Sequence, residues 1–427
     1  MNTTIPSRTH HAFAARDSRQ SNSPDWRPDL VSPPSPARDT AMDYLRAFVT
    51  LLVLAHHAVL AYLPFAPAPS GSFTAPPVMW PAFPIVDTHR WHGIETFVGF
   101  NDIFFMSLMF FLSGLFLWPS LARKGAGKFA RDRALRLGLP FIGAAGLLAP
   151  LAYYPSYRVT GADPSLGGFW GAWRSLGSWP AGPAWFIWVL LAFGLGAVAL
   201  TKLFPRWGET LGRGAAALGR RPALNFAALV AVSAAAYVPM GLAFDPTRWV
   251  SWGPFAFQVS RILLYATYFL AGAAVGAGGL ECGLLAADGK LARRWPLWVA
   301  ASAGAFILAT LAFLVLIQIL MRGQTSLAWR VINNFTFVLS CAGTSFALLA
   351  LFARFGRARF RALDSLSRNA YGMYLFHYAI VSWVQMSLLN LAWPGAAKGS
   401  FVFAAAVLAS WGLTAGLRRI PAVARVI

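Results

Sequence analysis

Two ionisable residues, Arg46 and His57, lie in the first long apolar segment of the chain, DYLRAFVTLLVLAHHAVLAY. They are eleven residues apart, close to three helical turns, so their side chains share one helix face. At about 1.5 Å per residue, the imidazole lies about 16 Å beyond the arginine, near the middle of an apolar bilayer core about 30 Å thick. There a neutral imidazole can act as a general base, and the arginine can bind an anion. The alternative is an arginine that reaches the membrane surface and a histidine that bonds to a neighbouring helix.

A second histidine lies in a later apolar segment, SRNAYGMYLFHYAI. If this segment enters the membrane from the same side as the first, His377 lies about 11 Å deep, near the depth of His57. We therefore expect the two imidazoles to share a cavity. The alternative is a structural histidine whose ring bonds to a neighbouring carbonyl group.

Acidic residues are scarce in the apolar segments, although the chain contains 15 Asp and Glu residues. Asp43 is three residues before Arg46, so the two can pair on one helix. Glu95 and Asp102 are seven residues apart and share a face of the second apolar segment. Either acid can orient His57 or a substrate hydroxyl, or can pair with an arginine on the same side of the membrane.

A basic segment, ARKGAGKFARDRALRLGLP, follows the second apolar segment. Its Arg131, Arg133 and Arg136 lie on the membrane side where Arg46 is expected. Arginine binds phosphate through two parallel hydrogen bonds, so this segment predicts a site for an anionic cosubstrate with several phosphates. The alternative is a segment that only sets the membrane topology and contacts anionic lipids.

The composition predicts an all-α integral membrane protein, because 57% of the residues are hydrophobic and only 12% are charged. The net charge of +21 does not indicate nucleic acid binding, because the basic residues fall mainly between the apolar segments. We expect a bundle of about ten membrane-spanning helices in the lipid bilayer. Their predicted ranges are 42–63, 95–118, 137–155, 183–203, 223–243, 255–278, 296–320, 331–353, 370–393 and 400–417.

Three regions follow from this pattern. Residues 1–41 are rich in Ser, Pro, Arg and Asp and are predicted to be a disordered tail. Residues 42–418 form the transmembrane domain, and residues 419–427 form a short tail. Lys and Arg are concentrated in alternate connections, which places both termini in the cytoplasm. The two cysteines, Cys282 and Cys341, do not have the spacing of a metal site, so we expect free thiols and no bound metal.

The longest connections on the predicted outer side, 64–94 and 156–182, are rich in aromatic residues. These rings can form an interfacial belt at the membrane surface, or they can stack on a sugar ring. Both possibilities stay open at the level of sequence.

Four segments resemble the membrane acyltransferase 3 family. DYLRAFVTLLVLAHH is similar to its first helix, and FFMSLMFFLSGLF with KFARDRALRLGLP resembles its FF-x-SG helix and the basic stretch that ends in proline. GPAWFIWVLLAF resembles its Trp-Phe helix, and SRNAYGMYLFHY its late Tyr-Leu-x-His helix. The four matches occur in family order between about 43 and 378, so the resemblance covers most of the chain.

This resemblance implies a multi-pass O-acyltransferase of the inner membrane. Members transfer acyl groups from cytoplasmic acyl-CoA to hydroxyls of surface or exported glycans, and the second segment is most similar to the branch that modifies periplasmic glucans. Acyl-CoA is then a cosubstrate, and no cofactor is bound permanently. Many members carry an acid where this chain has Ser107, so any role for an acid moves to Asp102 or Glu95, or is absent.

The mechanism implied by the resemblance uses His57 as the general base. The phosphates of acyl-CoA bind Arg46, Arg133 and Arg136, and the base acts on a hydroxyl that arrives from the outer side. Transfer through a covalent acyl-histidine is a variant that the sequence leaves open. Trp185 and Tyr374 shape the tunnel, and His377 binds or orients a substrate. The alternative function is a secondary transporter or flippase that uses the buried His and Arg for proton or anion coupling.

Overall fold

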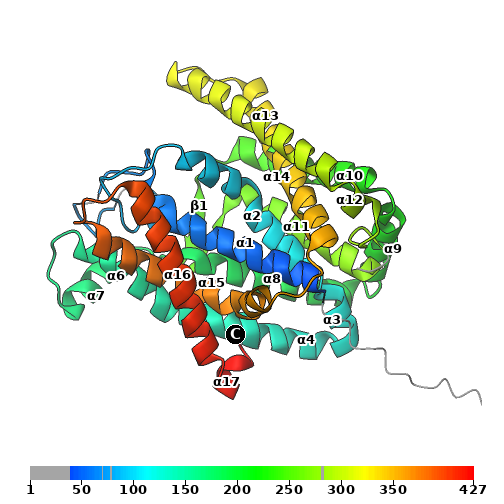
Figure 1. Cartoon of the computed structure of the whole chain (residues 1–427), viewed down its shortest axis with the longest axis horizontal. Coiled ribbons are helices and arrows are strands. Elements are labelled where there is room, and N and C mark those ends of the chain that lie inside the picture. Colours follow the sequence, from blue (N-terminus) through cyan, green and yellow to red (C-terminus); the bar gives the residue numbers. More distant parts are fainter. Residues whose placement is uncertain (1–38, 70, 77–78, 280–282) are drawn as a thin grey trace, which may run out of the picture. The chain divides into compact units, whose positions relative to one another are not determined.

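The described part of the chain is a bundle of helices. The computed structural model describes residues 39–69, 71–76, 79–279 and 283–427, and Figure 1 shows their arrangement. Predictions for residues 1–38 and for Cys282 fall outside this part. Nine of its helical segments are long and apolar enough to cross a membrane: Thr40–Tyr62, Ile94–Lys124, Ala126–Arg158, Gly182–Leu203, Pro222–Ala243, Val259–Gly278, Trp295–Met321, Leu327–Phe355 and Gly395–Leu417. The predicted fold class, an all-α membrane bundle, is confirmed.

The individual helices are numbered as in Figure 1. The first part of the chain contains α1 (Thr40–Val59), α2 (Ile94–Gly114), α3 (Leu117–Lys124), α4 (Ala126–Arg133), α5 (Leu139–Gly143), α6 (Ala149–Arg158), α7 (Leu166–Ser175), α8 (Trp185–Leu203), α9 (Trp207–Gly219) and α10 (Pro222–Ala243). The second part contains α11 (Ile262–Gly278), α12 (Lys290–Arg293), α13 (Trp295–Met321), α14 (Leu327–Phe355), α15 (Arg361–Leu388), α16 (Gly395–Leu417) and α17 (Pro421–Ala424).

Short elements connect or interrupt these helices. Four are 3₁₀-helices, namely η1 (Leu60–Tyr62), η2 (Trp80–Ala82), η5 (Gly182–Ala184) and η6 (Val259–Arg261). Two are π-helical turns, η3 (Ala134–Gly138) and η4 (Ala144–Leu148), on either side of α5. Together with α4, α5 and α6 they make one continuous helical segment, so the expected span at 137–155 begins earlier, at Ala126. Proline within such a segment favours irregular turns because it lacks the backbone N–H that an α-helix needs.

A β-hairpin replaces the start of the expected span at 255–278. Its strands, β1 (Trp249–Trp252) and β2 (Phe255–Gln258), pair antiparallel, with Trp249 opposite Gln258. Gly253 has a φ of 54°, a left-handed conformation that the tight turn needs and that glycine adopts without strain. The prediction was therefore wrong for residues 255–258, and the spanning segment begins at Val259. An apolar strand and an apolar helix start look alike in sequence when the run is short.

Helix α15 covers most of the ninth expected span, 370–393, but is not among the nine apolar segments. It is long enough to cross a membrane, and it carries buried polar side chains on the face that packs against α1 and α16. Near its start, the Tyr44 hydroxyl donates to Asp364 (2.7 Å), and near its end, the Gln385 amide donates to the carbonyl of His57 (3.1 Å). Helices α1 and α15 therefore run in the same direction, as entry from one membrane face requires.

Helix α2 packs very closely against α11. A Cβ atom added at Gly272 would lie 2.0 Å from the carbonyl oxygen of Phe111, and one at Gly276 would lie 1.9 Å from that of Leu115. Only glycine allows this approach of two backbones, a common feature of helix pairs in membranes. The contact fixes α2, and hence Asp102, relative to α11 and Arg261.

Candidate functional site

Helix α1 presents Arg46 near its first turns and His57 near its end. The side chain of Asp39 accepts hydrogen bonds from the backbone N–H groups of Ala41 (3.1 Å) and Met42 (3.3 Å), so it caps the helix. Arg46 donates to Asp43 (3.0 Å), the pair that the sequence suggested. Its guanidinium also lies 5.2 Å from the centre of the Phe116 ring. These contacts fix the direction of the arginine.

Two more arginines, Arg133 and Arg136, lie near Arg46 at the start of α1. The guanidinium of Arg133, on α4, lies 5.0 Å from the centre of the Phe129 ring and experiences the charges of both Arg136 and Arg46. The hydroxyl of Tyr371 donates to the carbonyl of Arg136 (2.8 Å), which links the π-turn η3 to α15. Like charges held this close repel each other, and a bound polyanion would relieve the repulsion. Arg131 is exposed on α4 and is not among the charges that act on Arg133.

The two histidines that the sequence placed at similar depth are in contact. The distance between His57 Nδ1 and His377 Nε2 is 3.3 Å. His57 Nδ1 also lies 2.9 Å from the carbonyl oxygen of Val53, and His377 Nδ1 lies 2.7 Å from that of Tyr374. His377 is completely buried, whereas His57 is partly exposed.

These contacts fix the positions of the ring protons when both rings are neutral. A carbonyl oxygen can only accept, so His377 Nδ1 carries the proton that is donated to Tyr374, and its Nε2 is an acceptor. His57 Nδ1 must then carry the proton that is shared between Val53 and His377. The remaining nitrogen, His57 Nε2, has a free lone pair, and none of the described residues hydrogen-bonds to it. This is the protonation state that a general base or a nucleophile requires.

Tyrosines enclose the histidine pair. The rings of Tyr378 and His57 meet edge to face, with centroids 5.1 Å apart, and the hydroxyl of Tyr378 donates to the carbonyl of Pro81 in η2. The hydroxyl of Tyr374 donates to the carbonyl of Pro183 in η5. A cavity of about 20 Å³ lies against both tyrosines and is also lined by Pro183 and Ile187. It has room for about one water molecule beside the site.

Trp185 lies next to this pocket rather than in it. Its ring packs against Tyr265 (5.6 Å between centroids) and Trp249 (5.4 Å). The neighbouring residue, Phe186, contacts Tyr374 (5.7 Å). Trp185 therefore supports the wall that holds Tyr374, one layer away from the histidines.

The two candidate acids have other partners. Asp102 accepts from the Arg261 side chain through its carboxylate (2.6 Å) and its backbone carbonyl (3.0 Å). Glu95 accepts from the backbone N–H of Gly93 (2.7 Å) at the start of α2. Within the described part of the chain, neither carboxylate hydrogen-bonds to His57. Of the two, Asp102 is nearer to the histidines, because its charge acts on His56, the neighbour of His57.

Two residues of this region were not predicted as part of the site. His56 is buried and stacks on Phe105, with ring centroids 5.1 Å apart, and its Nδ1 has no hydrogen-bond partner among the described residues. Arg261 is buried and forms the ion pair with Asp102. The sequence did contain a signal for Arg261, because besides Arg46, and Lys202 at the very end of its segment, it was the one Lys or Arg inside an expected span.

The aromatic residues of the connections 64–94 and 156–182 mostly pack on each other. Phe73, Trp80, Phe169 and Trp173 are buried in one cluster with tyrosines of α6. Trp170 is partly exposed, so it is free to contact lipid or ligand. Most of these rings therefore stabilise the connections instead of forming a belt or a stacking platform. Across the described residues, no group of three or more His, Cys, Asp or Glu side chains could hold a metal ion.

Comparison with known proteins identifies the family of the chain. Residues 39–415 match the acyltransferase domain of the acyltransferase 3 family, and this range contains the arginine cluster, both histidines and every helix that positions them. No curated protein and no solved structure matches the chain. The matched range covers most of the chain, and the chain therefore belongs to the membrane acyltransferase 3 family and is a multi-pass membrane enzyme that transfers acyl groups.

Proposed function

We propose that this enzyme transfers an acetyl or succinyl group from cytoplasmic acyl-CoA to a hydroxyl group of a surface or periplasmic glycan. One observation carries the proposal. His57 Nδ1 is held as a donor by Val53 and His377, which leaves Nε2 unprotonated and free. Arg46 lies on the same helix, eleven residues or about 16 Å away, so a donor bound at the arginines extends toward the imidazole.

The arginine cluster is the proposed donor site. Arg46, Arg133 and Arg136 come from different elements and form a concentrated positive charge. The phosphates of CoA suit such a cluster, because guanidinium groups bind phosphate oxygens in pairs of parallel hydrogen bonds. The positive charge of the arginine cluster supports placing it on the cytoplasmic side of the membrane, together with both termini. The proposed membrane is the inner membrane of the cell.

The proposed reaction begins with a proton transfer to His57. Nε2 takes the proton of the acceptor hydroxyl, and the hydroxyl oxygen attacks the thioester carbonyl carbon. The C–S bond breaks as the C–O bond forms, and the imidazolium returns the proton to the thiolate of CoA. His377 keeps the ring of His57 in the correct tautomer throughout, since its Nε2 accepts from Nδ1.

A covalent route uses the same atoms. In that route Nε2 attacks the thioester, CoA leaves, and the acyl group is passed from the imidazole to the acceptor. Both routes need a free lone pair on Nε2 and a proton on Nδ1.

The proposal is tested with membranes that contain the wild-type protein or the His57→Ala variant. They are incubated with acyl-labelled acetyl-CoA or succinyl-CoA and a periplasmic glycan fraction, and the label in the glycan is measured. Label that requires His57 supports the proposal. Absence of label from wild-type membranes with both donors would contradict the proposed donor and acceptor pair.

A further inference from the structure

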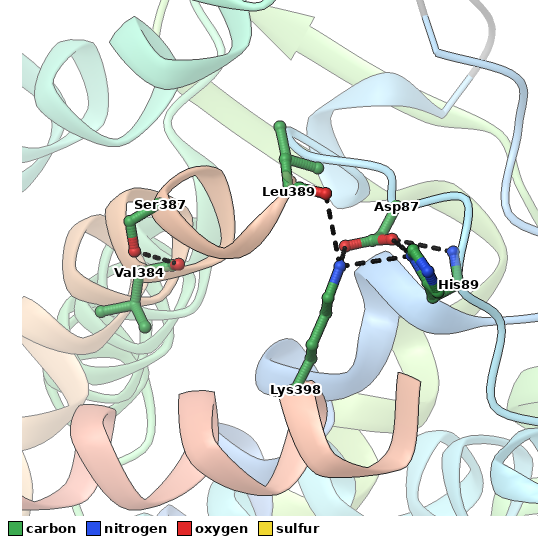
Figure 2. A network of polar contacts seen from close by, with 6 residues as sticks. All are labelled: Asp87, His89, Val384, Ser387, Leu389 and Lys398. Atoms are coloured by element: carbon green, nitrogen blue, oxygen red, sulfur yellow. Dashed lines mark hydrogen bonds and ion pairs between the residues drawn. The ribbon is translucent and has the colours of Figure 1, made fainter. Parts of the chain in front are cut away.

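A buried ion pair joins Asp87 to Lys398 near the start of α16 (Figure 2). The amino group of Lys398, on α16, donates to the carboxylate of Asp87 (2.7 Å), and both side chains are at most 1% exposed. The other carboxylate oxygen of Asp87 accepts from the backbone N–H of His89 (2.8 Å) and lies 3.1 Å from its ring. Lys398 also donates to the carbonyl of Leu389 (3.4 Å). Every charge of the pair is thus satisfied by a partner.

A buried ion pair of this kind is not expected to stabilise the fold more than apolar residues would. Removing two charges from water is costly, and apolar residues of similar size often stabilise a buried site as well or better. A lysine near the start of an apolar membrane helix adds a cost during insertion. In some proteins a buried pair instead specifies one arrangement among several.

The arrangement that it specifies is the path of residues 79–91. Apart from the short η2, this segment has no regular secondary structure, so its path depends on contacts with other elements. The backbone N–H of Asp87 donates to the carbonyl of Ala61 (3.0 Å), and that of Trp91 donates to Tyr62 (2.8 Å). The segment is therefore attached to η1, the turn that follows α1 and begins three residues after His57, and the ion pair attaches it to α16.

Residues 79–91 also contact the tyrosines beside the histidine site, through Pro81. The carbonyl of Pro81 accepts from the hydroxyls of both Tyr153 (2.7 Å) and Tyr378. The ring of Tyr378 rests with its edge against His57. A shift of the segment would remove the partner of this hydroxyl, and the ring that covers the imidazole would move.

We propose that Asp87 and Lys398 are positioning residues for acyl transfer. They fix residues 79–91, and through the carbonyl of Pro81 they hold Tyr378 against His57. This inference rests on the proposed function in one respect only, that His57 is the reacting group. Its test measures the chemical reactivity of the His57 imidazole without acyl-CoA or glycan. Failure of the positioning role can therefore be distinguished from failure of the proposed acyl transfer.

The test is the rate at which diethyl pyrocarbonate modifies His57 in the full-length protein in lipid nanodiscs, measured by mass spectrometry of the modified peptide. The variants are the double substitution Asp87→Leu/Lys398→Met, called the ion-pair variant, the single substitution Tyr378→Phe, and the triple variant that carries all three substitutions. Tyr44→Phe is the matched control, because it removes a tyrosine hydroxyl at the opposite ends of the same two helices. We expect the ion-pair variant and Tyr378→Phe each to raise the rate about tenfold, and Tyr44→Phe to leave it unchanged.

The combination distinguishes a shared effect from two separate ones. If the ion pair acts through Tyr378, the triple variant reacts no faster than the faster of its parents. A rate within about twofold of wild type for the ion-pair variant, or multiplied effects in the triple variant, would overturn the proposal. If the apolar pair does not fold, Asp87→Asn replaces it, since asparagine keeps the size of the side chain and removes its charge.

The kinetic consequence provides a second readout. Because the pair is remote from the arginine cluster, Asp87→Asn should lower kcat and leave the KM for acyl-CoA unchanged. An increase in that KM with an unchanged kcat would contradict a positioning role at His57.

Discussion

The contact between the two histidines predicts a difference between two similar variants, His377→Asn and His377→Gln. An asparagine amide can replace Nδ1 of His377 as the donor to Tyr374, but it is too short to replace Nε2 as an acceptor. A glutamine amide reaches the position of Nε2 and can accept from His57. The two variants therefore differ in one of the two contacts that hold Nδ1 of His57.

The size of the effect follows from the shared hydrogen bond. The proton on His57 Nδ1 is divided between Val53 (2.9 Å) and His377 (3.3 Å), so loss of the longer partner leaves the shorter one in place. A hydrogen bond of this kind contributes about 0.5–1.5 kcal/mol, which corresponds to a decrease in kcat of about two- to twelvefold for His377→Asn. We expect His377→Gln to retain most of the wild-type kcat.

The assay is acyl transfer at saturating acyl-CoA, with rates divided by the amount of protein in the membrane. The reasoning would be refuted if His377→Asn matched the wild type, or if the glutamine variant were the slower of the two. Equal amounts of both proteins in the membrane show that a difference in rate does not come from folding.

Three further predictions concern other parts of the molecule. Arg133→Met should raise the KM for acyl-CoA about tenfold or more, because charge-assisted hydrogen bonds contribute about 1.5–3 kcal/mol, whereas the exposed Arg131→Met should change it at most about twofold; equal effects in titrations with acyl-CoA would contradict the donor site. Gly272→Ala should destabilise the protein by about 1–3 kcal/mol, since its Cβ would meet a carbonyl of α2 at 2.0 Å, and an unchanged thermal unfolding midpoint would contradict this packing. The hydroxyl and backbone N–H of Ser165 hold the pKa of Asp163 below its ordinary value, so their contribution to the start of α7 is present above the ordinary pKa and is lost as the pH falls through the lowered one. Ser165→Ala should shift the loss of amide protection in α7 to higher pH, and an unchanged pH profile in hydrogen exchange would count against it.

The features that the sequence could predict are those carried by one helix. The helical period places Arg46 and His57 on one face, and the spacing of three residues brings Asp43 to Arg46. Apolar runs of sufficient length predicted the membrane bundle, because a bilayer imposes that length on any helix that crosses it.

The features that the sequence could not predict depend on contacts between distant elements. His57 and His377 are 320 residues apart, and Asp87 and Lys398 are 311 apart, so only the packing of α1, α15 and α16 brings them together. Depth alone suggested that the histidines are neighbours, but it did not indicate which nitrogen remains free. The role of Asp102 depends in the same way on Arg261, which the close contact of α2 and α11 brings to it.

The central claim is that Nε2 of His57 is the reacting atom, and His57→Gln tests it most directly. Glutamine keeps a polar side chain of similar reach but cannot take up a proton near neutral pH. Acyl transfer from labelled acyl-CoA is measured in membranes that contain equal amounts of the variant and the wild type. We expect the variant to insert into the membrane and to bind acyl-CoA as the wild type does, with no transfer. Transfer at the wild-type rate by His57→Gln would contradict the assignment of His57 as the base.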